Sequence, residues 1–280
     1  MSNLYIYHNM GLGDMIHCNG MVRYFLRESE YDKVYVFTKT SHKKSVDWMY
    51  RDDDRIETIG VSENMEENAH KITRMIRTII DRDDENLELL QQLTRQRSAI
   101  LLANNSYEPS DDFLIVGQEF YKDKGNDIGG MPCDMIFYEQ INVPYSERFD
   151  SCYWERDMEE EERVYKKLAP EDGNYIFVHD DPTRLEVPGG FVIGDNEVGD
   201  KSTIIRNDLS ESIFHFGKLL ENAKEIHCME SSIRCMIEYF KPNLIKNKVK
   251  LYMHKFRGGP YYNKELGVWN GTHLPWINIP

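Results

Sequence analysis

The chain has 280 residues, 40% hydrophobic and 12% aromatic, enough to bury the core of one large domain or two of ordinary size. Its formal net charge of −14 argues against a general nucleic-acid-binding protein, because neutralising phosphates requires clustered Lys and Arg. The five cysteines form no CxxC pair, which favours reduced thiols in a cytoplasmic protein. No run approaches the roughly 18 apolar residues of a membrane span, and Tyr5, His8 and Asp14 interrupt any signal-peptide core.

The first half of the chain alternates strand and helix patterns. A β-rich stretch at 4–8 precedes apolar residues at near-helical spacing between 15 and 28, for which Asp14 is a natural N-cap. The next predicted elements are a strand at 33–39, a helix at 41–50 capped by Ser41, a strand at 55–61, surface helices within 66–97, strands at 99–104 and 112–120, and an irregular connection at 121–150. This alternation predicts a parallel sheet with crossover helices.

The alternation starts again near residue 174. The predicted elements here are a helix at 157–169, a strand at 174–181, extended segments at 185–194 and 202–207, a helix at 210–223 capped by Ser210, a strand at 225–229, a helix at 230–240 and a strand at 248–254. The restart predicts an α/β fold of two tandem Rossmann-like domains, residues 1–150 and 151–280, which face each other across a cleft.

Three loops are candidate ligand sites, at 9–14, 179–184 and 230–232, because ligands of open parallel sheets bind outside the carboxyl ends of strands. In the first loop Gly11 and Gly13 let the backbone approach a ligand, and the following helix offers free N–H groups to an anion. "GLGDMI" lacks the third glycine of a dinucleotide fingerprint, and no Gly-Lys-Ser/Thr follows. A nicotinamide enzyme and a P-loop NTPase are therefore disfavoured.

A strand followed by "GLGDMIH" and an apolar-faced helix resembles the opening of GT-B glycosyltransferases of the heptosyltransferase type, and more distantly that of fucosyltransferase-like folds. In the second half, "YIFVHDD" resembles the first strand and loop of a nucleotide-sugar domain. "EIHCMESSIRCMIEYF" resembles the segment in which a strand ends at an acidic residue before a Ser/Thr-led helix. The chain departs from heptosyltransferases at Glu230-Ser231-Ser232, where they usually carry Asp-Thr-Gly, so the donor nucleotide and sugar stay open.

The resemblance implies a metal-independent glycosyltransferase that has no cofactor and moves a sugar from a nucleotide-diphosphate sugar to a glycan or other hydroxyl acceptor. It assigns the acceptor to the first domain and the nucleotide sugar to the second. Sugar transfer needs a base for the acceptor hydroxyl, and the resemblance gives this role to Asp14. His17, one turn along, would orient Asp14 or the acceptor. An N-cap and a packed surface histidine are the structural alternatives.

On the donor side, the resemblance implies that Glu230 hydrogen-bonds the donor ribose and that Ser231 and Ser232 hold phosphate. The alternative for these residues is a capped helix. Arg184 could pair with the diphosphate, since a guanidinium matches phosphate oxygens, or it is a surface arginine. His179 opens the same loop as a donor-side binding residue, and "HDD" offers too few ligand types to argue a metal site.

Two other functions stay open at this point, because fold alone does not settle function. One is a non-catalytic nucleotide-sugar-binding or interaction protein with a GT-B-like fold. The other is a GT-B-like epimerase. Binding of a nucleoside diphosphate without turnover would favour the first of these.

Overall fold

The computed structural model describes residues 2–8, 10–65, 111–117, 133–183, 190–198, 202–254, 256, 262–263, 268–269 and 274–279. The chain divides into two compact units, Met1–Trp154 and Glu155–Pro280, and each has its own parallel sheet. The helices predicted within 66–97 and the strand predicted at 99–104 lie outside the described residues. Within the described residues, no helix combines the length and apolar character needed to span a membrane.

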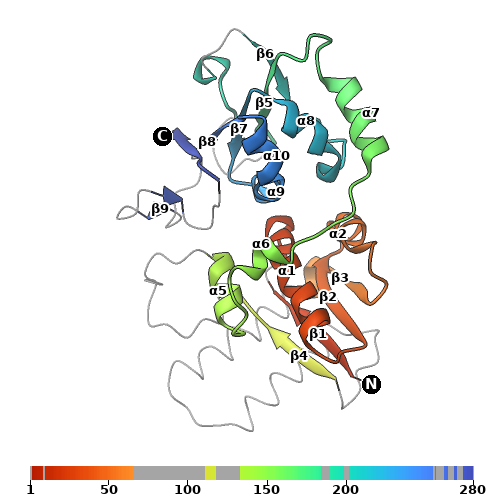
Figure 1. Ribbon diagram of the computed structural model, residues 1–280. Helices are drawn as coiled ribbons and strands as arrows, with labels where there is room; N and C mark the ends of the chain where they lie inside the picture. Colours follow the sequence, from red (N-terminus) through yellow and green to blue (C-terminus); the bar gives the residue numbers. More distant parts are fainter. Residues whose placement is uncertain are drawn as a thin grey trace. The chain divides into compact units, whose positions relative to one another are not determined.

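The described part of the first unit is built on a four-stranded parallel sheet in the order β3-β2-β1-β4 (Figure 1). Its strands are β1 (Asn3–Tyr7), β2 (Lys33–Lys39), β3 (Ile56–Val61) and β4 (Asp112–Ile115). Helix α1 (Leu12–Glu28) follows β1, and α2 (Lys43–Tyr50) follows β2. The chain thus runs outward from β1 to β3 and later places β4 on the other side of β1. The carboxyl ends of β1 and β4 therefore form a topological switch point, the usual ligand site of such sheets.

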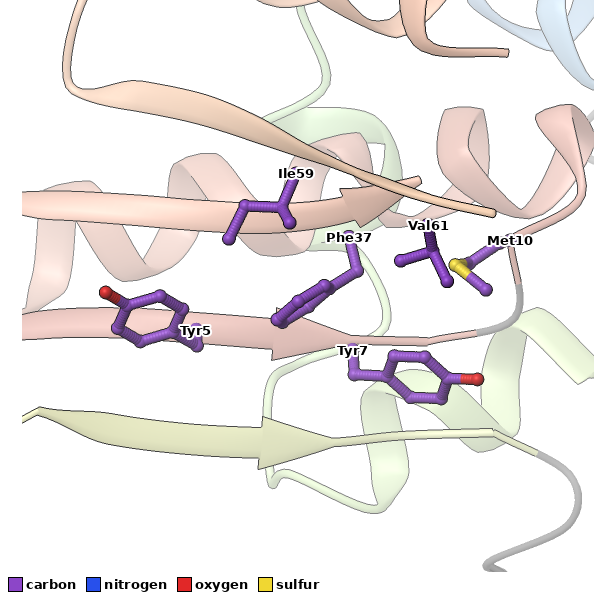
Figure 2. Close-up of a cluster of buried hydrophobic side chains, with 6 residues drawn as sticks. All are labelled: Tyr5, Tyr7, Met10, Phe37, Ile59 and Val61. Carbon is purple, nitrogen blue, oxygen red and sulfur yellow. The ribbon is translucent and has the colours of Figure 1, made fainter. Parts of the chain in front are cut away.

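Both faces of this sheet are buried, as a parallel sheet requires. Leu4, Ile6, Val34 and Val36 are fully buried on one face. On the other face, side chains of β1, β2 and β3 and of the loop after β1 form the cluster that Figure 2 shows, made of Tyr5, Tyr7, Met10, Phe37, Ile59 and Val61. The Tyr5 ring stacks between Tyr35 and Phe113 of the neighbouring strands, with centroids 4.7 and 6.2 Å away. These cross-strand pairs help to fix the register at the switch point.

Two short helices occupy part of the segment predicted to be irregular, so that prediction was wrong for residues 133–139 and 147–150. They are α5 (Cys133–Glu139) and α6 (Glu147–Asp150). Ile136, Phe137 and Tyr138 of α5 are fully buried. Helices this short gain their stability from tertiary packing, which the Gly and Pro content of the segment does not reveal.

The described part of the second unit contains a five-stranded parallel sheet in the order β11-β8-β7-β5-β6. Its strands are β5 (Tyr175–His179), β6 (Thr203–Arg206), β7 (Glu225–Met229), β8 (Lys250–His254) and β11 (Ile277–Ile279). Strand β6 lies on one side of β5, and the three later strands lie on the other. The switch point of this sheet is therefore between β5 and β7. Two parallel sheets of this kind confirm the predicted α/β class with two Rossmann-like parts.

The remaining elements of the second unit are helical or short. They are α7 (Met158–Leu168), η2 (Asp195–Glu197), η3 (Ile213–Phe216), α8 (Gly217–Asn222), α9 (Ser232–Ile237), η4 (Glu238–Phe240), α10 (Lys241–Lys246) and the pair β9 (Tyr262–Asn263) and β10 (Val268–Trp269). Asp157 is the N-cap of α7 and accepts the backbone N–H of Glu160 at 3.0 Å.

Two predicted helix caps were wrong. The N-cap of α2 is His42, because two turn hydrogen bonds, from His42 N to Lys39 O and from Lys43 N to Thr40 O, precede the helix. Ser210 lies in a turn in which its backbone N–H and hydroxyl both donate to Asp208 Oδ1, at 2.9 and 2.6 Å. Aspartate commonly forms such turns, and here the turn takes the place of the predicted first helical residues.

Candidate functional site

The glycine turn leads from the carboxyl end of β1 directly into α1. Gly11 is the N-cap, with extended backbone angles, and its carbonyl accepts the first helical hydrogen bond from Met15 N at 3.0 Å. Asp14 is the third residue of the helix and its carboxylate accepts the backbone N–H of Gly11. The prediction that Asp14 is the N-cap was therefore wrong. Its side chain reaches back to the N-cap, as the third residue of a capping box does.

Gly11 leaves the space that the Asp14 carboxylate occupies. A Cβ atom at position 11 would lie 2.8 Å from Asp14 Oδ2, closer than such contacts occur. Any side chain at this position would displace the carboxylate or break its hydrogen bond with the turn. The glycine thus fixes where Asp14 points. Gly13, the second residue of α1, lies in the same first turn.

The protonation of Asp14 is set by opposing effects. Burial raises its pKa to about 7, and the negative charge of Asp134 adds to this rise. The Gly11 N–H and the positive charge of Lys39 act in the opposite direction. Lys39 is the last residue of β2, so it belongs to the same edge of the sheet. A carboxyl group with this pKa can take up and release a proton at neutral pH, as a general base must.

We expect Gly11→Ala to raise the pKa of Asp14 further. The added Cβ pushes the carboxylate away from the Gly11 N–H, and this bond stabilises the ionised form. A ¹³C NMR titration of the aspartate carboxyl groups measures the change, with the Asp14 signal identified by its loss in Asp14→Asn. Gly60→Ala is the control, because its Cβ would meet Lys43 Cδ at an ordinary 3.4 Å. An unchanged titration midpoint in Gly11→Ala would contradict the role given to this glycine.

His17 lies one turn after Asp14 on α1 and is buried. Its carbonyl accepts the hydroxyl of Tyr138 at 2.8 Å, and the same hydroxyl accepts the N–H of Met21 at 3.0 Å. The Tyr138 hydroxyl is thus inserted into the backbone ladder of α1, where it holds α5 against this helix. His17 is packed, but it is buried and therefore not the surface histidine of the structural alternative, and its role toward Asp14 stays a prediction.

In the second unit a pocket of about 140 Å³ opens at the carboxyl ends of β5, β6 and β7. It brings together three of the predicted site residues, His179, Ser231 and Ser232. Its apolar lining residues are Leu209, Ile213, Phe216, Met229 and Ile233, and its polar ones also include Asn207, Asp181, Asp208 and Glu211. The pocket thus combines apolar side chains with a larger number of polar ones, and polar groups that converge on a pocket can orient a small molecule.

The carboxylates of Asp208 and Glu211 in this pocket form ion pairs with cationic side chains of α7. Lys167 pairs with Asp208 at 2.7 Å and with Glu211 at 2.8 Å, and Arg163 pairs with Glu211 at 2.5 Å. These hydrogen-bonded cations lower the pKa of Glu211 to about 2 and that of Asp208 below its usual range. Both groups are therefore carboxylates at neutral pH, and they can accept hydrogen bonds from hydroxyl groups. Neither residue was predicted from the sequence, because the carboxyl end of the 202–207 segment is not one of the three candidate loops.

Ser231 is the N-cap of α9, and its hydroxyl accepts the backbone N–H of Arg234 at 3.4 Å. This is the structural alternative for Ser231, and it leaves the phosphate role untested. Glu230 directly follows β7 and is half-buried, and it is not one of the residues that line the pocket. Arg184 lies outside the described residues.

The "HDD" loop does not assemble a metal-binding group in the described part of the chain. Asp180 accepts the backbone N–H of Ile193 at 3.0 Å and forms an ion pair with Arg206. Its carboxylate thus connects the end of β5 to the segment around Ile193 and to the end of β6. Among the described residues, no three His, Cys, Asp or Glu side chains are grouped as a metal ion would need.

No protein-family model and no curated protein matches the chain. Solved structures do. The crystal structure of the glycosyl transferase family 9 from Veillonella parvula DSM 2008 is 9% identical, with 99% of this chain and 86% of that chain covered and a TM-score of 0.51. The E. coli ADP-heptose lps heptosyltransferase II is 9% identical, with 100% and 90% covered and a TM-score of 0.48. The E. coli heptosyltransferase WaaC with ADP-2-deoxy-2-fluoro heptose is 11% identical, with 100% of this chain and 93% of that chain covered and a TM-score of 0.41.

At identities of 9–11% the structural likeness shows the fold alone and leaves the reaction open. The first of these structures supports a shared GT-B architecture over nearly the whole chain. The resemblance to glycosyltransferases of the heptosyltransferase type, predicted from "GLGDMIH" and the segments of the second half, is thus confirmed at the level of the fold.

Proposed function

We propose that the protein is a metal-independent glycosyltransferase that moves a sugar from a nucleotide-diphosphate sugar to the hydroxyl group of an acceptor such as a glycan. The observation that carries this proposal is the position and the raised pKa of the Asp14 carboxyl group. This carboxyl group lies at the switch point of a parallel sheet, held by the Gly11 N–H, and its pKa is raised to about 7. A carboxylate that only caps a helix does not need a raised pKa, whereas a general base works best with a pKa near the working pH.

The proposed reaction uses Asp14 as a proton acceptor. Its carboxylate takes the proton of the acceptor hydroxyl while the hydroxyl oxygen attacks the anomeric carbon of the donor sugar. The bond from that carbon to the diphosphate oxygen breaks, and the nucleoside diphosphate leaves with the electron pair. The acceptor is assigned to residues 1–150 and the nucleotide sugar to residues 151–280.

The pocket of the second unit is proposed to bind part of the nucleotide sugar. Its apolar lining suits a ring, and its carboxylates suit the hydroxyl groups of a ribose or of the sugar. His179, Ser231 and Ser232 line the same pocket, and Ser231 is also the N-cap of α9. Glu230 for the ribose and Arg184 for the diphosphate complete the proposed donor set.

We expect one nucleoside diphosphate among UDP, GDP, ADP and dTDP to raise the melting temperature of the protein, with CMP as a monophosphate comparison. A ligand that binds only the folded state stabilises it by about 2.7 kcal/mol at a hundredfold excess over its dissociation constant. Glu230→Gln should weaken this stabilisation if Glu230 binds the ribose, and Glu225→Gln is the control at the far end of the same strand. If none of the four diphosphates stabilises the chain, the donor class is wrong.

The turnover assay separates the enzyme from the non-catalytic alternative. The nucleoside diphosphate that stabilises the chain identifies the nucleotide of the donor. Transfer is then measured as the release of that diphosphate from the matching nucleotide sugar in the presence of an acceptor. Binding without release, over a set of acceptors that includes glycans, would favour the non-catalytic binding protein.

A further inference from the structure

Two buried histidines contact each other in the sheet of the second unit. His227 of β7 and His254 at the end of β8 are 2% and 3% exposed, and His227 Nδ1 lies 2.9 Å from His254 Nε2. The His227 ring also stacks on Tyr252 of β8, with ring centroids 4.4 Å apart. Apolar side chains usually fill the interior of a parallel sheet, so two adjacent imidazoles in this place call for an explanation.

A carboxylate lies at each outer end of this pair. The second ring nitrogen of His227, Nε2, is 3.5 Å from Glu225 Oε2, and the second ring nitrogen of His254, Nδ1, is 3.3 Å from Glu197 Oε2. Glu225 is on the same strand as His227, whereas Glu197 is the last residue of the short helix η2. The four side chains thus form a row with three contacts between neighbours, which we call the histidine row.

The number of ring hydrogens decides how many of these contacts can be hydrogen bonds. Each contact needs one N–H, because a carboxylate and an imidazole nitrogen without hydrogen can only accept. Two neutral imidazoles carry two N–H groups, so one of the three contacts stays incomplete. Within the described residues, the buried His227 Nε2 has no hydrogen-bond partner. One added proton completes all three contacts, whereas a second would point two N–H groups at each other across 2.9 Å.

Two carboxylates near the row are already paired with cations. Lys250 of β8 pairs with Glu225 at 2.9 Å. Asp180, which follows β5, also acts on His254 through its charge, but its carboxylate forms an ion pair with Arg206 of β6. These two carboxylates therefore contribute little net negative charge to the row.

The carboxylate of Glu197 is different. The other aspartate of η2, Asp195, pairs with Arg206 at 2.6 Å. Within the described part of the chain, Glu197 makes its ion contact with His254 alone, and its side chain is 45% exposed. One proton added to the two rings balances this single charge, and a second proton would exceed it.

Burial sets the pH range in which the row takes up its proton. It lowers the pKa of both histidines, and the neighbouring ring lowers the pKa of His227 further, while Glu225 and Glu197 act in the opposite direction. The pair is therefore neutral at neutral pH and becomes charged only on acidification.

Helix η2 belongs to a segment that covers the sheet and reaches the pocket of this unit. Ile193 and Val198, on either side of η2, pack in the cluster that contains Val178 of β5. Phe191 of the same segment exchanges two backbone hydrogen bonds with Asp181, at 2.8 and 3.0 Å. Asp181 lines the pocket, so the position of this segment bears on the pocket edge.

We propose that the histidine row is a pH switch that takes up one proton and thereby fastens η2 to the second sheet. The proton comes from the solvent and completes the third N–H contact of the row. With the proton shared between the two rings, Glu197 faces a cation instead of a neutral ring, and a charge-assisted hydrogen bond is roughly twice as strong as a neutral one. The switch requires neither the donor nor the acceptor of the proposed reaction.

The first measurement counts the protons that the two rings take up. The full chain, labelled with ¹⁵N in histidine, is titrated by NMR, and the His227 ring is identified by its contacts with the Tyr252 ring. We expect His227 and His254 to shift together with one midpoint below 6.5, each by about half of the shift of the histidines in the urea-unfolded chain. Two full shifts, or no shift while the chain stays folded, would overturn the switch.

The second measurement follows η2 by hydrogen exchange of its backbone. The N–H groups of Glu197 and Val198 donate to the carbonyls of Gly194 and Asp195. Their exchange, corrected for the pH dependence of exchange in an unfolded chain, should slow by about threefold or more as the row takes up its proton. Exchange that stays constant while the rings titrate would show that the proton does not fasten η2.

Glu197→Gln tests the row directly, and its partly exposed position allows the chain to fold with the substitution. The amide has no charge to attract the proton, so the midpoint of the two rings should fall and the slowing of exchange should disappear. Asp195→Asn is the matched control, because it removes the same charge from the same helix but pairs with Arg206. Equal effects of the two substitutions would assign the behaviour to the general charge of η2 and overturn the role of the row.

Discussion

Asp14→Asn will lower the rate of sugar transfer at neutral pH by roughly 10² or more, the usual scale for the loss of general base catalysis. Asparagine keeps the size of the side chain, and its amide oxygen can still accept the Gly11 N–H that the carboxylate accepts. The loss is therefore one of proton acceptance rather than of the turn. In the parent enzyme the rate should rise with pH through about 7, because the base acts in its ionised form.

The same substitution will stabilise the protein, and the gain will depend on pH. In the unfolded chain the Asp14 carboxyl loses its proton near its ordinary pKa of 3.8, and in the folded chain near 7. Between these values the folded state binds more protons than the unfolded state, so the free energy of unfolding of the parent falls as pH rises. Above about 7 both states are ionised and the loss is complete. Asparagine has no proton to lose, so its advantage is absent near pH 4 and full above pH 7.

Thermal and urea unfolding at pH 5 and pH 8 measure this gain. One pH unit of difference between the two pKa values corresponds to about 1.4 kcal/mol, so the difference between 3.8 and about 7 corresponds to a stabilisation of about 4 kcal/mol at pH 8. Asp157→Asn is the control, because Asp157 is a true N-cap and asparagine caps as well as aspartate. Equal stability changes at the two pH values would mean that Asp14 is an ordinary carboxylate. Unchanged transfer activity would leave "GLGD" as a structural turn.

The strands could be predicted from the sequence because burial on both faces gives continuous apolar runs. The predicted ranges 33–39 and 225–229 agree with β2 and β7 at both ends. The caps were less well predicted. A carboxylate at the N-cap and one at the third helical residue both precede an apolar run, so the sequence could not distinguish these positions for Asp14.

The residues that act on Asp14 could be found only in part. The turn and Asp14 stand together in the sequence, and the parallel sheet places them at an edge where ligands bind. Asp134 is far away in the chain and sits on a short helix that the Gly and Pro pattern concealed. Lys39 ends a predicted strand, but nothing local shows that the neighbouring strand ends beside it. Tertiary packing, which carries no local signal, supplies this part of the site.

Gly20→Ala will destabilise the first unit by about 2–3 kcal/mol, the size expected for a severe clash in a packed core. Gly20 lies inside α1, where replacing glycine by alanine normally stabilises a helix by about 1 kcal/mol. Here the new Cβ would lie 2.1 Å from the carbonyl oxygen of Glu147 and 3.1 Å from Cα of Arg148. These are backbone atoms, so no side-chain rotation can relieve the clash.

The backbone of α6 cannot easily retreat, because Arg148 is tied to Asp134 and Tyr145 inside the unit. Urea unfolding measures the loss. Gly60→Ala is the matched control, because its Cβ would meet only side-chain atoms, Lys43 Cδ at 3.4 Å and Thr40 Oγ1 at 3.6 Å. A Gly20→Ala protein as stable as the parent, or more stable, would show that helix propensity outweighs the contact with α6.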